Sequence, residues 1–230
     1  MSPAARAVVA GLMFAAGPAF AAETVSFETE DGAKIYADFY RGGDRGVVLA
    51  HGGRYTRASW EPQAKELRAR GFTVLAPDFR GYGNSVGPGK EDPLSAPLHL
   101  DLLAAVRYLR DRGVRSVAIV GGSLGGMAAG DALLHMKPGE IDRVVFLGSR
   151  ATLSGGDVSK MPGRKLFIVA RDDVQGTSTL RLTGIRRDYE SVPEPRELIV
   201  VDGAAHAQAL FDTVQGPDVF TAIEKFLGAE

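Results

Sequence analysis

A serine between glycines stands where a predicted strand ends and a predicted helix begins. Ser123 is the third residue of Gly-Gly-Ser-Leu-Gly-Gly at 121–126, directly after the apolar run at 117–120. On such a turn the serine hydroxyl projects from the carboxyl edge of a sheet, and glycine neighbours let strand and helix approach without a clash. We interpret Ser123 as a nucleophile. A phosphate-binding loop fits less well, since Met127 stands where that loop has its lysine.

A serine hydroxyl needs a base to remove its proton as it attacks, and histidine is the usual one. Of the 4 histidines, His206 follows the last predicted strand on a loop of small residues, at the edge of the sheet where Ser123 is expected. His135 lies about 12 residues further along the helix that Ser123 begins, roughly 18 Å away, and is interpreted as a helix surface residue. His51 and His99 precede the nucleophile in the chain. His206 is therefore the predicted general base.

The imidazole in turn needs a carboxylate that holds its tautomer and stabilises its protonated form. Asp172 and Asp173 both follow the apolar run at 166–170, between the serine and the histidine in chain order. The conformation of that loop decides which of them reaches the histidine. We favour Asp173 and keep Asp172 as the alternative.

Acyl transfer through a tetrahedral intermediate also needs two N–H donors for the oxyanion. The residue after the nucleophile supplies one of them, here Leu124. The second is predicted at Gly53, in His-Gly-Gly-Arg at 51–54, where glycine lets the backbone come close to a ligand. A tight turn in which His51 hydrogen-bonds locally accounts for the same residues, and the two interpretations are compatible.

The elements that must position these residues follow the pattern of an α/β sheet. Alternating runs at 25–29 and 35–40 flank a glycine-containing turn and predict an antiparallel hairpin. Buried parallel strands are predicted from apolar runs at 47–50, 73–76, 117–120, 144–147, 166–169 and 198–201. Helical periodicity covers 58–70, 98–112, 124–136, 180–190 and 217–227. The expected fold is a mostly parallel central sheet of about eight strands with helices on both faces.

Composition excludes several classes of function. The 230 residues carry a net charge of −1, and no long run of like charge is present, so no nucleic-acid partner is expected. The chain has no cysteine, which excludes disulfides, thiolate nucleophiles and cysteine-ligated metal sites.

The N-terminal segment has the features of a secretory signal peptide. Arg6 precedes an apolar run at 7–16, and the small-residue motif Ala-Phe-Ala follows at 19–21. We predict a signal peptide at 1–21 and a periplasmic or secreted protein. The remainder, 22–230, is expected to form a single domain without a membrane span.

Taken together, these residues resemble the α/β-hydrolase superfamily over essentially the whole mature chain. The His-Gly-Gly loop, the segment Ala-Pro-Asp-Phe-Arg-Gly-Tyr-Gly-Asn-Ser at 76–85, the Gly-x-Ser-x-Gly turn, the late aspartate and the terminal histidine occur in that family's order. The resemblance implies the α/β-hydrolase fold and places Asp78 and Arg80 in a structural loop beside the site. The chain departs from the family at Ala170, where members commonly have glycine before the acid.

The same family often inserts a cap domain after the sixth strand. Here only about fifteen residues, 150–164, are available for it, so no cap domain is expected and the site should be open. Residues expected near its rim are Arg54, Tyr55, Trp60 and Phe211.

These features predict a serine hydrolase that acts on a small-molecule carboxylic ester through an acyl-enzyme, with no metal or organic cofactor. Two alternatives stay open: a peptidase or amidase that resembles the prolyl-oligopeptidase type, and a catalytically silent binding module on the same scaffold. An aspartate in place of Ser123 would instead have indicated dehalogenase or epoxide chemistry. The acyl group, the alcohol and the oligomeric state do not follow from the sequence.

Overall fold

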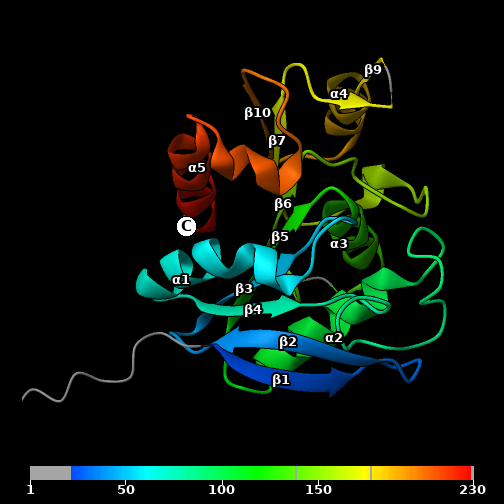
Figure 1. Cartoon of the computed structure of the whole chain (residues 1–230), viewed down its shortest axis with the longest axis vertical. Helices are drawn as coiled ribbons and strands as arrows, with labels where there is room; N and C mark the ends of the chain where they lie inside the picture. The colour runs from blue at the N-terminus through cyan, green and yellow to red at the C-terminus, as the bar shows by residue number, and fades with distance from the viewer. Residues whose placement is uncertain (1–21, 138, 177, 229–230) are drawn as a thin grey trace, which may run out of the picture.

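The computed structural model describes residues 22–137, 139–176 and 178–228. The predicted signal peptide at 1–21 lies outside the described residues. Figure 1 shows a twisted central sheet with helices packed on its two faces.

The central sheet has 8 strands in the order β1-β2-β4-β3-β5-β6-β7-β10. Their bounds are β1 Glu23–Glu28, β2 Lys34–Tyr40, β3 Arg45–Ala50, β4 Thr73–Pro77, β5 Ser116–Gly122, β6 Arg143–Leu147, β7 Arg164–Ala170 and β10 Arg196–Val201. The β1–β2 and β2–β4 pairs are antiparallel, and every other pair is parallel. The predicted edge hairpin and the six predicted parallel strands are thereby confirmed, and so is the α/β-hydrolase fold.

Helices cover both faces of the sheet because neighbouring side chains of each strand point to opposite sides. On β3, Val48 belongs to one core cluster, while Val47 and Leu49 belong to the other. The first cluster includes residues of α2 (Leu98–Arg110), α3 (Leu124–His135) and α4 (Arg181–Ser191). The second includes residues of α1 (Glu61–Ala69) and α5 (Gly216–Gly228). The five predicted helices are present, with ends that differ by a few residues.

Five shorter elements were not predicted as separate elements, although the 3₁₀ helix η1 (Arg57–Trp60) overlaps the start of the predicted helix 58–70. They are the strands β8 (Val174–Gln175) and β9 (Thr179–Leu180) and the 3₁₀ helices η1, η2 (Val158–Lys160) and η3 (Ala207–Asp212). Each is too short for an apolar period to show in the sequence. The segment between β6 and β7 contains η2 and no inserted domain, as predicted. Among the described residues, no helix is both long enough and apolar enough to cross a membrane.

Candidate active site

Ser123 stands alone between the last residue of β5 and the first residue of α3. Its backbone has φ 49° and ψ −111°, in a region that L-residues with a side chain rarely adopt. Neighbouring strands hold this conformation, since the Ser123 N–H donates to the Leu147 carbonyl at 3.0 Å. The Ser123 carbonyl accepts from the Ser149 hydroxyl at 2.8 Å. Strain that is held in this way is typical of functional sites.

Two glycines make the strand-to-helix turn possible. A Cβ at Gly121 would lie 2.5 Å from the Cα of Gly126, and a Cβ at Gly125 would lie 2.2 Å from the Ala50 carbonyl oxygen. Both contacts are with backbone, which cannot give way locally. The glycines that the sequence analysis associated with a nucleophile turn are therefore required by close packing of β5, β3 and α3.

The structure brings the three predicted catalytic side chains together. The Ser123 Oγ lies 2.8 Å from His206 Nε2, and the His206 Nδ1 lies 2.7 Å from Asp173 Oδ2. A carboxylate accepts from Nδ1–H, which leaves Nε2 as the acceptor for the serine hydroxyl. Asp173 is 1% exposed, directly behind the imidazole. Of the two aspartates left open, Asp172 is exposed and contributes a backbone hydrogen bond to Gly203 instead.

His51 is a structural residue of the loop that follows β3. Its Nδ1 lies 2.9 Å from the Gly52 carbonyl and so carries the proton, while its Nε2 accepts from the Phe79 N–H at 3.1 Å. Burial lowers the pKa of His51 below its ordinary value of 6.5, which favours this neutral form. Both ring nitrogens are therefore used locally, as one of the two interpretations of this loop predicts.

The peptide between Gly52 and Gly53 is fixed by donors on one side. The Gly52 carbonyl meets His51 Nδ1 and also accepts from the Tyr55 N–H at 2.9 Å. The next N–H, that of Gly53, points the opposite way because the peptide is trans. The Gly52 N–H donates to the Gln208 side chain at 3.1 Å, which ties this loop to η3, directly after His206. Sequence reasoning did not find this role of Gln208.

Gly53 and Leu124 are neighbours across the site. A Cβ at Gly53 would lie 3.5 Å from Leu124 Cδ2, an ordinary contact. Leu124 is the first residue of α3, so its N–H has no acceptor within the helix. Both residues line the same cavity as Ser123. Gly53 and Leu124, the two predicted donor residues, therefore line one cavity with Ser123.

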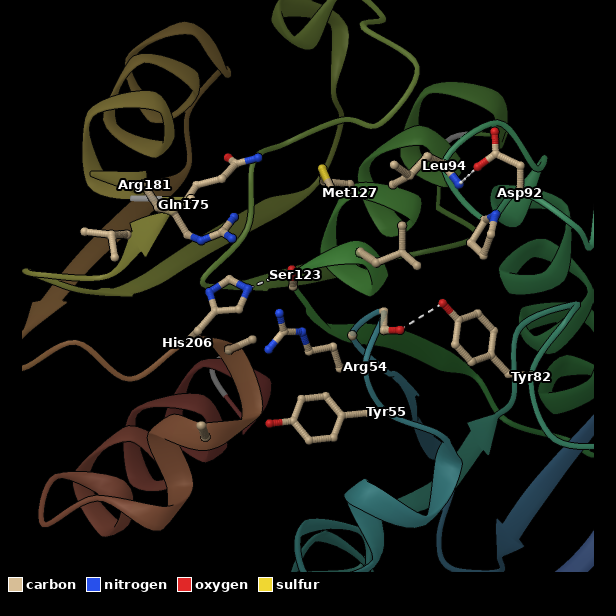
Figure 2. A pocket seen from close by; sticks show the side chains of 18 residues that line it. Arg54, Tyr55, Tyr82, Asp92, Leu94, Ser123, Met127, Gln175, Arg181 and His206 are labelled. Carbon is tan, nitrogen blue, oxygen red and sulfur yellow. Dashed lines mark hydrogen bonds between the residues drawn. The ribbon is translucent and has the colours of Figure 1, made fainter. Parts of the chain in front are cut away.

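The cavity at this edge of the sheet has a volume of about 880 Å³. Figure 2 shows His206, Arg181 and Gln175 on one side of Ser123 and Tyr82, Asp92 and Leu94 on the other.

Two of the four predicted rim residues, Arg54 and Tyr55, line this cavity. The prediction was wrong for the other two. Trp60 is fully buried and packs edge-on against Phe211, with ring centroids 5.8 Å apart. Trp60 belongs to the core, and the half-buried Phe211 of η3 packs against that core; neither residue lines the cavity.

Asp78 and Arg80 are structural, as the resemblance implies. The Asp78 carboxylate accepts from the backbone and the guanidinium of Arg57, at 2.7 and 2.6 Å. Arg80 is fully buried between Asp101 and Asp31, and its hydrogen bond lowers the pKa of Asp31 to about 2. Neither residue lines the cavity.

A family profile agrees with this arrangement. The alpha/beta hydrolase family matches residues 47–226, most of the chain and all of the site described above. The chain belongs to this family.

Relatives of this alpha/beta hydrolase differ in the reactions for which they are named. An epoxide hydrolase of Caballeronia sordidicola is 32% identical over 109 residues, which are 46% of this chain and 32% of that protein. A carboxylesterase of Bacillus subtilis is 33% identical over 92 residues, or 38% of this chain and 35% of the other. The chain thus spans about a third of the length of these two curated relatives. An esterase of Pyrococcus furiosus has the same fold, with a TM-score of 0.74 at 23% identity over 91% of this chain and 94% of that one.

The remaining histidines of the hydrolase lie away from the cavity. His135 is exposed at the end of α3, as predicted, and its ring stacks on His99 at 4.5 Å. Among the described residues, no group of three or more His, Asp or Glu side chains could hold a metal ion.

Sequence reasoning missed three groups that line the cavity. These are the loop residues 92–94, residues 174–176 together with Arg181, and Met127 on α3. Met127 falls one turn after the nucleophile, so its position on the cavity side of the helix could have been read from the helical period. The other two carry no local signal, because the path of a loop is set by contacts that are distant in sequence.

Proposed function

We propose that the protein is a serine hydrolase that cleaves carboxylic esters through an acyl-enzyme. The observation that carries the proposal is the 2.8 Å contact between Ser123 Oγ and His206 Nε2. Ser123 makes this contact from a backbone turn with a positive φ, a strained conformation that hydrogen bonds with a neighbouring segment of the chain must maintain. A structural serine at a strand-to-helix junction needs neither a neighbouring imidazole nor a buried carboxylate behind it.

In the proposed reaction, Ser123 Oγ attacks the ester carbonyl carbon while its proton passes to His206 Nε2. The C–O bond to the alcohol then breaks, and the imidazolium gives the proton to the departing oxygen. Water repeats the sequence: His206 takes its proton, the hydroxide adds to the acyl carbon, and the acid leaves as Ser123 regains its hydrogen. Asp173 stays ionised and stabilises the imidazolium through Nδ1–H.

We propose the N–H groups of Gly53 and Leu124 as the oxyanion donors. Both residues line the cavity with Ser123, and both backbone segments are held in place, one by His51, Tyr55 and Gln208 and the other by the start of α3. Donors held in place before the reaction need no reorganisation when charge develops on the carbonyl oxygen.

Ester chemistry is favoured over epoxide opening by the nucleophile itself. One similar protein is named an epoxide hydrolase, but the nucleophile position here holds a hydroxyl rather than the carboxylate that we associate with that chemistry. The carboxylesterase and the archaeal esterase are named for the proposed reaction.

The test is hydrolysis of para-nitrophenyl acetate by the protein and by folded variants. We expect Ser123→Ala and His206→Ala each to lower kcat by about a millionfold relative to the parent protein. His135→Ala is the matched control, because that histidine is exposed on α3 away from the cavity, and should leave kcat within about twofold. Equal turnover by Ser123→Ala, or turnover of aminoacyl anilides without any ester turnover, would refute the proposal.

We also propose, from the sequence of residues 1–21, that the protein is exported. N-terminal sequencing of the protein from the periplasm or medium of a producing cell should find a chain that begins near residue 22. An intact N-terminus on cytoplasmic material alone would contradict export.

A further inference from the structure

Two arginines line the cavity that contains Ser123 and His206. Arg54 follows Gly53 in the loop after β3, and Arg181 begins α4. Figure 2 shows both side chains pointing into the cavity beside His206. We infer that the substrate is an ester that carries a carboxylate, and that Arg54 and Arg181 bind this carboxylate. The inference rests on the proposed ester hydrolysis and adds the class of its substrate.

Arg181 is incompletely paired within the protein. Its Nε lies 3.3 Å from Asp173 Oδ1, yet this buried nitrogen has no hydrogen-bond partner among the described residues. The other oxygen of that carboxylate is already the acceptor for His206 Nδ1. The Nη groups of Arg181 likewise have no partner in the described chain. The Nη groups are therefore the donors of this guanidinium that are open to a ligand, and a substrate carboxylate there would accept charge-assisted hydrogen bonds.

Arg54 makes no contribution to the fold through polar contacts. No hydrogen bond, ion pair or ring contact joins its side chain to another described residue. Arginines that do serve the fold are paired, as Arg150 is with Asp188 through two hydrogen bonds of 2.5 and 2.7 Å. An unpaired guanidinium that points toward a nucleophile is available to a ligand.

The side chains of the cavity lining that can carry charge are Arg54, Arg181, His206 and Asp92, and the buried Asp173 lies against Arg181 and His206. Asp92, which also lines the cavity, lies beside Leu94 and across from Arg181 in Figure 2. Its carboxylate is already engaged, accepting from the Ser95 hydroxyl at 2.6 Å and the Leu94 N–H at 3.1 Å. Met127 and Leu94 provide apolar surface for the rest of the ester. Two guanidinium groups can bind a planar carboxylate through several charge-assisted hydrogen bonds.

The test compares esters that carry a carboxylate with neutral counterparts. For the alcohol half the pair is meta-acetoxybenzoate and meta-acetoxybenzamide. For the acyl half it is para-nitrophenyl hemisuccinate and para-nitrophenyl butyrate. In at least one pair we expect kcat/KM to favour the carboxylate by about tenfold or more, and the preference to fall as salt is raised. The pair that shows it locates the carboxylate on that half of the substrate.

Variants of the two arginines test whether Arg54 and Arg181 cause the preference for the charged ester. Arg54→Gln and Arg181→Gln should each reduce the ratio of kcat/KM between charged and neutral ester several-fold, and Arg54→Lys should retain part of it. The ratio is used because Arg181 also contacts Asp173, so its loss can slow both esters alike. Arg186→Gln is the matched control: this arginine is exposed on α4 and does not line the cavity.

Binding without turnover separates this inference from the proposed function. Folded Ser123→Ala cannot form an acyl-enzyme, so calorimetric titration of this variant measures affinity alone. Titrations with meta-acetoxybenzoate and meta-acetoxybenzamide compare the affinities for the alcohol half. Titrations with para-nitrophenyl hemisuccinate and para-nitrophenyl butyrate compare them for the acyl half. Tighter binding of a carboxylate that Arg54→Gln removes supports the inference even if no ester is turned over. Equal affinity and equal kcat/KM for charged and neutral compounds in both pairs would overturn it, whereas the proposed function would stand if the neutral esters are hydrolysed.

Discussion

Ser123 is the proposed nucleophile and also has a strained backbone, and the two properties can be separated by substitution. Its positive φ of 49° costs about 1–3 kcal/mol for a residue with a Cβ. Glycine adopts such angles without that cost, although it gains entropy in the unfolded chain. We predict that Ser123→Gly raises the free energy of unfolding by about 1 kcal/mol relative to Ser123→Ala, as measured by urea denaturation. Equal stability of the two inactive variants would contradict the strain.

The neighbouring aspartates provide a matched pair for the role of the acid. Asp173 holds His206 Nδ1 at 2.7 Å, while the exposed Asp172 makes no contact with that ring. We predict that Asp173→Asn lowers kcat for para-nitrophenyl acetate by about 10⁴-fold, since the amide favours the wrong tautomer of the histidine. Asp172→Asn should retain kcat within about twofold. The reverse order would reassign the acid.

His51, in the loop after β3, makes the stability of the fold depend on pH. Its pKa is lowered by burial, so between the ordinary value of 6.5 and the lower folded-state pKa the unfolded chain binds a proton that the folded chain does not. Stability therefore falls as the pH drops below 6.5. We predict that nitrogen NMR of the histidine rings finds His51 as the neutral Nδ1–H tautomer at pH 6.5, where a free imidazole is half protonated. A half-protonated ring at that pH would contradict this account.

Among single residues, the sequence predicted those whose roles follow a set order along the chain. It did not predict contacts between residues that are far apart in the chain. Ser123 and His206 follow from the need of a serine for a base at the carboxyl edge of a sheet. The choice of Asp173 over Asp172 depended on the turn after β7, which puts one carboxylate under the imidazole and the other in solvent. Gln208 acts through Gly52, which lies 156 positions earlier in the chain, and no local pattern marks such a contact.

Among the elements, the junction of β5 with α3 depends most on residue size. A Cβ at Gly125 would meet the Ala50 carbonyl oxygen at 2.2 Å, whereas a Cβ at Gly53 meets nothing closer than 3.5 Å. We predict that Gly125→Ala destabilises the fold by about 3 kcal/mol or more, which lowers Tm by roughly 10 °C in a thermal melt. Gly53→Ala should keep Tm within a few degrees. A wild-type Tm for Gly125→Ala would contradict the close packing described.

Longer elements were predictable because each buries enough apolar side chains to show a period. The strands of the central sheet and the five α-helices fall into this class. The β8–β9 hairpin does not, since its two strands are exposed pairs of residues that no core contact selects.

In the molecule as a whole, the parallel strands bring segments that are distant in the chain to one edge of the central sheet. The carboxyl ends of β3, β5, β7 and β10 carry the loop at 51–54, Ser123, Asp173 and His206, which is why their chain order was informative. The loop at 92–94 reaches the same cavity by another route. Arg80, which donates to the Pro88 carbonyl at 3.0 Å, and the bridge between Lys34 and Val86 hold the segment that leads to it. These two contacts join the edge hairpin to the rim of the cavity, and no local sequence pattern predicts them.

We propose that Ser123 is a nucleophile that His206 and the strained turn make reactive. The most direct measurement is labelling of the folded protein with a fluorophosphonate probe, followed by mass spectrometry of its peptides. We expect one adduct, on Ser123, that is absent from folded Ser123→Ala and strongly reduced in folded His206→Ala. Absence of any adduct on correctly folded protein, or an adduct on another residue, would contradict the account and favour a binding module on this scaffold.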